Sequence, residues 1–252
     1  MEIHRLESKQ SLARAAARIA ATKLREAIAA QGHAYFIAAT GVSQFDFLAV
    51  LTSDRSIDWS KTTMFHLDEY VGISADRPAS FRRYLHERLV NIVHPKVVHF
   101  IEGDTSHPQA ECDRLNDLIT QCEIDVAFVG IGENGHLAFN DPPADFETEE
   151  PYIVVDLDEA CRRQQVGEGW FAGIEDVPEQ AISMSIKQIM KSRSIICIVP
   201  DKRKAQAVHD CLEGNVTPQH PASILQKHSD TWMYLDADSA SLLEKRPLSN
   251  QH

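Results

Sequence analysis

An imidazole, an amide and a carboxylate follow directly on a glycine-rich turn in the middle of the chain. The side chains are those of His136, Asn140 and Asp141, and the turn spans residues 130–135. Glycine is favoured where a backbone bends sharply or lets a ligand approach closely. A histidine near a carboxylate can act as a general acid or base. The pattern therefore favours a catalytic site, although a plain turn with a surface histidine is the alternative.

A second small-residue turn could bind an anion. Thr40, Gly41, Val42 and Ser43 lie between a short apolar run and a segment with helical character. A strand, a tight turn and a helix in this order present free backbone N–H groups to a phosphate. The alternative is an ordinary turn in which Ser43 only caps the helix.

Two adjacent carboxylates and a lysine complete the candidate chemistry. Asp68 and Glu69 follow another apolar run, where a general base could stand, although a helix cap or a solvated loop would use the same residues. Lys204 begins a helical segment and by itself is typical of a solvated surface. In so acidic a protein, however, a phosphate site needs a cation, which favours a binding role for Lys204.

Charge and cysteine usage exclude several classes of partner and site. The chain has 252 residues and a formal net charge of -12, which disfavours binding to nucleic acid or to an anionic membrane surface. Its five cysteines are dispersed without a CxxC pair, and its twelve histidines are equally scattered. This usage predicts reduced thiols in a cytoplasmic protein and no metal site. The N-terminus is charged and no apolar stretch is long enough to span a membrane.

Strands and helices alternate along the chain, which predicts a single-domain, doubly wound α/β fold. We expect a Rossmann-like, mostly parallel sheet with helices on both faces, because right-handed crossovers join parallel strands. The loops after its strands then meet at one edge. We expect one domain over 1–246 and a disordered tail over 247–252. The predicted strands are 34–39, 62–67, 97–101, 126–131, 152–157, 181–185, 194–199 and 231–235; the predicted helices are 11–31, 44–51, 79–93, 108–122, 158–171, 186–191, 201–212, 222–226 and 239–245.

Four segments resemble those of glucosamine-6-phosphate deaminases (isomerases). Residues 65–72 and 130–142 resemble the two signature stretches of that family, 40–43 its phosphate loop and 200–205 its phosphate-binding lysine segment. The resemblance extends over 34–243. The related 6-phosphogluconolactonases share the fold and the Gly-x-Gly-x-x-Gly-His core, but they usually place Asp-Glu-Arg where this chain has Asp-Glu-Tyr.

The resemblance implies a function and roles for individual residues. His136, with Asp141 beside it, would open the pyranose ring of glucosamine-6-phosphate. Asp68 would then move a proton between the amine-bearing carbon and the aldehyde carbon, giving fructose-6-phosphate and ammonia without a cofactor. Asn134 would orient the histidine. The positions expected to bind the sugar phosphate are Thr40, Gly41, Val42, Ser43, Glu69, Gly135 and Lys204.

The chain also departs from the family pattern. Asn134 stands where the family has an aspartate, and Asp141 replaces a longer glutamate. The arginine that deaminases often use on the phosphate has no clear equivalent, because Arg162 and Arg163 are out of register. Two other functions therefore stay open, a sugar-phosphate lactonase and a sugar-phosphate sensor that has lost catalysis. The sequence also leaves open whether the chain forms a homo-oligomer.

Overall fold

The computed structural model describes residues 1–244, so the predicted disordered tail over 247–252 lies outside the described residues. Seven parallel strands form the central sheet, in the order β1-β10-β9-β6-β2-β3-β5. Their bounds are β1 Glu2–Leu6, β2 Ala34–Ala38, β3 Thr62–His66, β5 Val97–His99, β6 Val126–Val129, β9 Ser194–Val199 and β10 Thr231–Asp236. The predicted doubly wound, mostly parallel sheet is confirmed.

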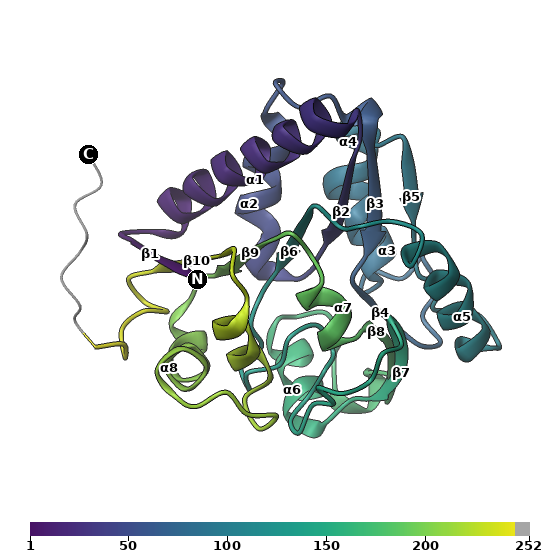
Figure 1. Cartoon of the computed structure of the whole chain (residues 1–252). Helices are drawn as coiled ribbons and strands as arrows, with labels where there is room; N and C mark the ends of the chain where they lie inside the picture. Colours follow the sequence, from purple (N-terminus) through teal and green to yellow (C-terminus); the bar gives the residue numbers. More distant parts are fainter. Residues whose placement is uncertain (245–252) are drawn as a thin grey trace.

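Helices cover both faces of this sheet (Figure 1). One core cluster joins α1, α2 and α3 to the sheet, and a second cluster joins α5, α7 and α8 to the opposite face. Successive residues of β2 alternate between the clusters, because side chains of a strand point to opposite faces. The helices are α1 Lys9–Gln31, α2 Phe45–Ser53, α3 Phe81–Leu85, α4 Asn91–Val93, α5 Pro108–Ile119, α6 Glu159–Gly167, α7 Ile186–Met190 and α8 Ala205–Glu213.

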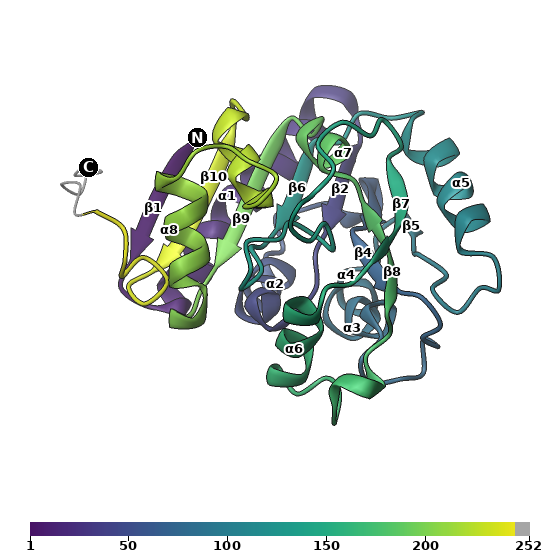
Figure 2. The ribbon, with the colours of Figure 1, turned by 90° about the horizontal axis from the view of Figure 1, so that it is seen from below.

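A second, antiparallel sheet of three strands was not predicted. Its order is β4-β8-β7, with β4 Asp68–Tyr70, β7 Tyr152–Asp156 and β8 Gln180–Met184. The end of 62–67 was expected to lead into a loop, but the chain instead continues into β4. Figure 2 shows α6 beside α3 on this side of the molecule, and an aromatic and aliphatic cluster packs the two helices together.

Short helical segments and turns account for the other differences from the prediction. The helix predicted over 79–93 consists of α3, a π-helical turn and α4 in direct succession. The helix predicted over 239–245 is wrong for 239–244, which form turns. There the Asp236 carboxylate accepts a hydrogen bond from the Ser239 N–H, and the Ser239 hydroxyl accepts one from Asp236 N–H. The short segments are η1 Val42–Gln44, η2 Trp59–Lys61, η3 His86–Val90, η4 Ile174–Asp176, η5 Lys202–Lys204 and η6 Pro221–Lys227. Among the described residues, no helix is long and apolar enough to cross a membrane.

Candidate active site

The strand order reverses between β2 and β6, and the candidate site lies there. From β2 the sheet continues through β3 to β5, whereas from β6 it continues through β9 to β10. The loops after two such neighbours run to opposite faces and leave a crevice between them. A cavity with about 530 Å³ of empty space opens at this point. Its lining includes Asp68, His136 and Lys204 together with all of residues 40–43. Four chain segments that are far apart in the sequence therefore meet at one rim.

The loop after β2 is fixed by its neighbours. Gly41 has φ +94°, a backbone conformation that side-chain-bearing residues rarely adopt, so glycine is required here. The Tyr84 hydroxyl donates a hydrogen bond to the Gly41 carbonyl at 3.1 Å, and the Gln44 amide donates one to Ser43 Oγ at 3.2 Å. The helical segment η1 begins at Val42 and continues into α2. The loop thus holds the start of a helical run against the cavity, as an anion site requires.

The His136 ring is held by backbone on one side and by a carboxylate on the other. A Cβ atom at Gly132 would lie 2.3 Å from the ring carbon Cε1, so only glycine fits under the imidazole. Nδ1 of His136 lies 3.1 Å from Oδ1 of Asp141. Burial raises the pKa of Asp141, but His136, the Asn134 amide and a backbone N–H outweigh it, and the pKa lies below its ordinary value. Asp141 therefore remains a carboxylate beside the imidazole.

Asn134 links the groups around Asp141 and does not line the cavity. Its Oδ1 accepts a hydrogen bond from the His136 N–H at 3.1 Å. Its Nδ2 donates to Asp141 at 3.0 Å and to Asp158 at 3.1 Å. The amide therefore bridges two carboxylates by donating to both, which an ionised aspartate at position 134 could not do.

Asp68 carries the clearest electrostatic signature of the site. It is the first residue of β4, and only 6% of it is exposed. Burial, and then the charge of Glu69, raise its pKa to about 8. A carboxyl group with this pKa is largely protonated at neutral pH and becomes a base just above it. Such values are typical of catalytic acids and bases, although structural networks perturb pKa values as well.

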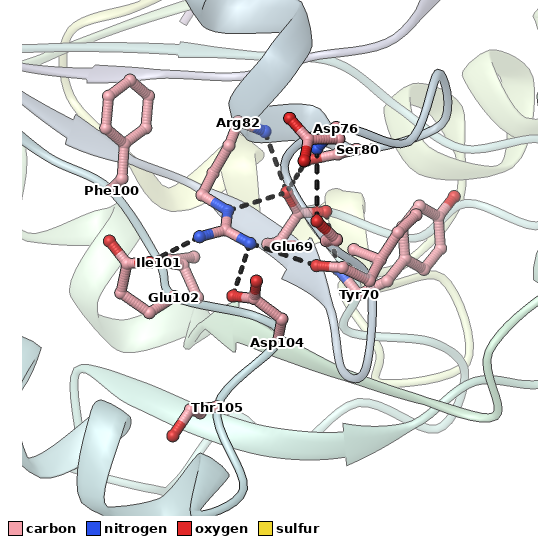
Figure 3. A network of polar contacts seen from close by, with 12 residues as sticks. Glu69, Tyr70, Asp76, Ser80, Arg82, Phe100, Ile101, Glu102, Asp104 and Thr105 are labelled. Carbon is pink, nitrogen blue, oxygen red and sulfur yellow. Dashed lines mark hydrogen bonds and ion pairs between the residues drawn. The ribbon is translucent and has the colours of Figure 1, made fainter.

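Glu69 does not line the cavity. Figure 3 shows its carboxylate within a polar network with Ser80 and Arg82. Its carboxylate accepts hydrogen bonds from the Ser80 hydroxyl and from the N–H groups of Phe81 and Arg82, which caps the start of α3. Burial raises its pKa to about 7, and the hydrogen bonds to the carboxylate oppose that rise. The Arg82 guanidinium lies behind it and pairs with two further acids, Glu102 and Asp104. Since Phe81 lines the cavity, Glu69 joins the strand of Asp68 to the cavity wall.

Gly135 is a further predicted binding residue that the structure leaves outside the cavity lining. It has φ +85°, and its N–H donates to the Gly132 carbonyl at 3.1 Å. Its carbonyl accepts a hydrogen bond from the Ala222 N–H at 2.9 Å. Gly135 therefore closes the turn that presents His136.

Lys204 is buried, with 5% of its surface exposed, and it lines the cavity. Burial lowers its pKa, while the charges of Glu168 and Glu133 act in the opposite direction. A buried ammonium group facing a cavity needs an anionic partner. Glu168 supplies part of that charge, and a bound anion could supply the rest.

Helix α6 and the residues after it contribute a cavity wall that the sequence analysis missed. Gln164, Gln165 and Glu168 line the cavity, and neither Arg162 nor Arg163 does so. Arg162 donates to the carbonyls of residues 174 and 177, and Arg163 pairs with Glu159. The glutamines carry no charge and stand in no recognisable motif. Their only sequence signal is that they directly follow Arg162 and Arg163.

Fold and cavity together define a class, the doubly wound α/β proteins with a cavity at the point where the strand order reverses. The family model described as glucosamine-6-phosphate isomerases/6-phosphogluconolactonase matches residues 7–234, which is most of the chain. The chain belongs to this family, as the signature stretches indicated.

Individual relatives agree with this assignment. The chain is 40% identical to a glucosamine-6-phosphate deaminase of Exiguobacterium sibiricum, over 81% of this chain and 79% of the relative. It is 38% identical to one of Streptococcus pneumoniae, over 82% and 86%. A solved monomeric glucosamine-6-phosphate deaminase superposes with a TM-score of 0.87 at 31% identity, covering 96% of this chain and 100% of that one. A 6-phosphogluconolactonase of Trypanosoma brucei, with a TM-score of 0.79, 16% identity and coverage of 96% and 98%, shares the fold.

Proposed function

We propose that this protein converts glucosamine-6-phosphate, or a close amino-sugar phosphate, to fructose-6-phosphate and ammonia. One observation carries the proposal: Asp68 and His136 line the same cavity as the loop 40–43 and Lys204. An acid–base pair and an anion-binding loop thus share one space. The relatives named glucosamine-6-phosphate deaminase, at 38% and 40% identity over most of the chain, support it.

Ring opening is the first step, and we assign it to His136. The imidazole would take the proton of the anomeric hydroxyl and return one to the ring oxygen, which breaks the bond between that oxygen and the anomeric carbon. Asp141 would stabilise the protonated imidazole, because it stays ionised 3.1 Å from Nδ1. Asn134 would act as a positioning residue through its hydrogen bonds to both partners.

Asp68 would carry out the isomerisation. Its carboxylate would remove the proton from the carbon that bears the amine and deliver it to the neighbouring aldehyde carbon. The intermediate enolamine is planar, so one carboxylate on one face can serve both carbons. Water then adds to the resulting imine and ammonia leaves. The substrate's own carbonyl delocalises the carbanion charge, so we expect no cofactor and no resident metal.

The phosphate would be bound at the other end of the cavity by Thr40, Gly41, Val42, Ser43 and Lys204. Binding energy gained there orients the reacting carbons against Asp68 and His136 without taking part in the chemistry. We assign Glu69 and Gly135 to positioning, since neither lines the cavity.

The test is an ammonia-release assay across a panel of amino-sugar phosphates in deuterium oxide. We expect ammonia together with deuterium at the carbon next to the carbonyl, because the enolamine exchanges its proton with solvent. Hydrolysis of a 6-phosphogluconolactone without ammonia release from any amino sugar would overturn the proposal in favour of a lactonase. Thermal stabilisation by the amino-sugar phosphates without any turnover would overturn it in favour of a sensor.

We also propose that the protein acts in the cytoplasm, without a nucleic-acid or membrane partner. Its free cysteines and its net charge of -12 support this. A monomer or a homo-oligomer would fit the site, which lies within one chain, and light scattering on the purified protein distinguishes them.

A further inference from the structure

Three side chains with different donor atoms, one of them His136 of the candidate acid–base pair, meet beside the cavity. His136, Asp141 and Cys161 each bring one ligand atom, and these atoms all lie within 4.8 Å of one another. Cys161 belongs to α6 and has no part in the proposed reaction. It is 1% exposed, and its position is fixed because its own N–H donates to the Asp158 carboxylate. An imidazole nitrogen, a carboxylate oxygen and a thiol sulfur are the usual ligands of zinc.

We propose that His136, Asp141 and Cys161 form a site for a thiophilic divalent cation such as Zn²⁺, whose binding inhibits the enzyme. The binding stands apart from the proposed function, whereas the inhibition rests on it. The cation would be a regulator or an inhibitor and not a resident cofactor.

The distances suit a small tetrahedral ion. Metal–nitrogen and metal–oxygen bonds of about 2.0–2.2 Å place two such ligands roughly 3.3 Å apart in a tetrahedron. The Nδ1 to Oδ1 distance of 3.1 Å is already close to this value. The sulfur lies within 4.8 Å of one imidazole nitrogen and one carboxylate oxygen, so a side-chain adjustment of about 1 Å brings it to the roughly 3.6 Å that a metal–sulfur bond of about 2.3 Å implies.

An independent observation points to the same place. Nδ1 of His136 is buried without a hydrogen-bond partner, because its contact with Asp141 has ion-pair distance but not hydrogen-bond geometry. His136 is 8% exposed, and Gly132 leaves no room for its ring to turn away. A buried nitrogen that lacks a hydrogen-bond partner and lies 3.1 Å from a carboxylate, in one cluster with a thiol, is available as a metal ligand.

A cation can reach Asp141 without passing the phosphate loop. An acidic groove with about 800 Å³ of empty space adjoins the site, and Asp141, Asp145, Asp156 and Asp158 all line it. A concentration of carboxylates raises the local concentration of divalent cations. The groove thus gives access to Asp141, and none of residues 40–43 or Lys204 lines it.

Binding would disable the acid–base pair. The cation loses water ligands, the Cys161 thiol loses its proton to solvent, and a sulfur–metal bond forms with no change of oxidation state. Nδ1 and the Asp141 carboxylate are then both occupied by the cation. The imidazole keeps its orientation, but with Nδ1 bound to the cation the one proton of the neutral ring lies on Nε2, so no nitrogen is free to take the proton of the anomeric hydroxyl.

Cobalt offers a readout that does not depend on activity. We would titrate the full-length reduced protein with Co²⁺ and record the near-ultraviolet absorption that arises from a thiolate–cobalt bond. We expect one equivalent to produce the band in the wild type and in Cys122→Ala, a control at a half-buried cysteine outside the cluster. Cys161→Ala should lose the band. Absence of the band in the wild type, or its persistence in Cys161→Ala, overturns the site.

Inhibition is tested separately with Zn²⁺ alone. Loss of an outer-shell partner already weakens metal sites by about 10–100-fold, so losing a direct ligand should raise the inhibitory Zn²⁺ concentration for Cys161→Ala by at least about tenfold. Turnover without Zn²⁺ should stay near that of the wild type. Equal sensitivity of both proteins overturns the inhibition. If no amino-sugar phosphate is turned over, the proposed function fails while the cobalt titration still decides the site.

Discussion

Replacing Asp68 by asparagine should abolish turnover and at the same time stabilise the fold. The carboxyl group is buried beside Glu69, and its pKa rises from 3.8 to about 8. Asparagine has nearly the same shape but carries no charge. The variant therefore removes the base of the proposed reaction together with the cost of holding that charge in a buried position.

The size of the stabilisation depends on pH, and its sign is fixed by the direction of the shift. A carboxyl group with a raised pKa binds its proton more tightly in the folded than in the unfolded chain, so wild-type stability falls as pH rises from about 4 to about 8. Each pH unit in that window costs about 1.4 kcal/mol. The free energy of unfolding of Asp68→Asn relative to wild type should thus grow by roughly 4 kcal/mol between pH 5 and pH 8.

Urea unfolding at several pH values measures this difference. Asp117→Asn is the matched control, because Asp117 is exposed on α5 and its variant should track the wild type at every pH. A constant offset between Asp68→Asn and wild type across the window would refute the inference that the carboxyl group is protonated in the folded state.

Activity tests the same group independently. A missing acid–base catalyst typically costs 10²–10⁴-fold in rate. The turnover of Asp68→Asn should therefore fall by at least about 10²-fold. For the wild type, kcat/KM should rise with pH toward about 8, since only the deprotonated carboxyl can accept a proton. Ammonia release by Asp68→Asn at a near-wild-type rate would refute the assigned role.

Three further substitutions test the surroundings. Lys204→Ala should raise KM for the sugar phosphate by roughly 10- to 100-fold with a smaller effect on kcat, because a hydrogen bond to a charged group contributes about 1.5–3 kcal/mol. An unchanged KM would contradict the phosphate contact. Asn134→Asp should lower the free energy of unfolding at pH 7 by about 1–3 kcal/mol, because the donor between Asp141 and Asp158 is lost, and equal stability in urea would argue against that role. Glu168→Gln should lower KM by up to about tenfold, or about 1.4 kcal/mol, by removing a like charge near the phosphate, and a higher KM would show that the carboxylate assists binding.

The fold was largely predictable because its strands are apolar runs between amphipathic helices. Most strands of the two sheets match the predicted ranges to within two residues at either end. The exceptions are short or exposed. Strand β1 has a half-buried, charged sequence at the sheet edge, and β4 is three residues long. The pairing of β4 with β8 joins segments that are far apart in the sequence, and no local sequence pattern predicts it.

The site residues were predictable where their positions follow from the sheet topology. They were not predictable where their positions depend on which way a side chain points. Asp68, His136 and the loop 40–43 come together because loops after parallel strands meet at one edge. Glu69 points away because it follows Asp68 within a strand, where neighbouring side chains face opposite sides. The sequence suggested a loop there, and a loop imposes no such alternation.

The cavity wall from α6 bears on how a phosphate would be held in so acidic a protein. The lining residues include one lysine, and Glu168 opposes its charge. Glu168 also comes close to the loop, with its Oε2 4.0 Å from where a Cβ atom at Gly41 would lie. A dianion entering this space would therefore depend on backbone N–H groups and on the amides of Gln164 and Gln165 more than on net positive charge. Dipoles fixed in a protein are screened little by salt, whereas the charge of an arginine at the surface would be screened strongly. Substrate affinity should for that reason depend less on ionic strength here than in a relative that holds the phosphate with an arginine.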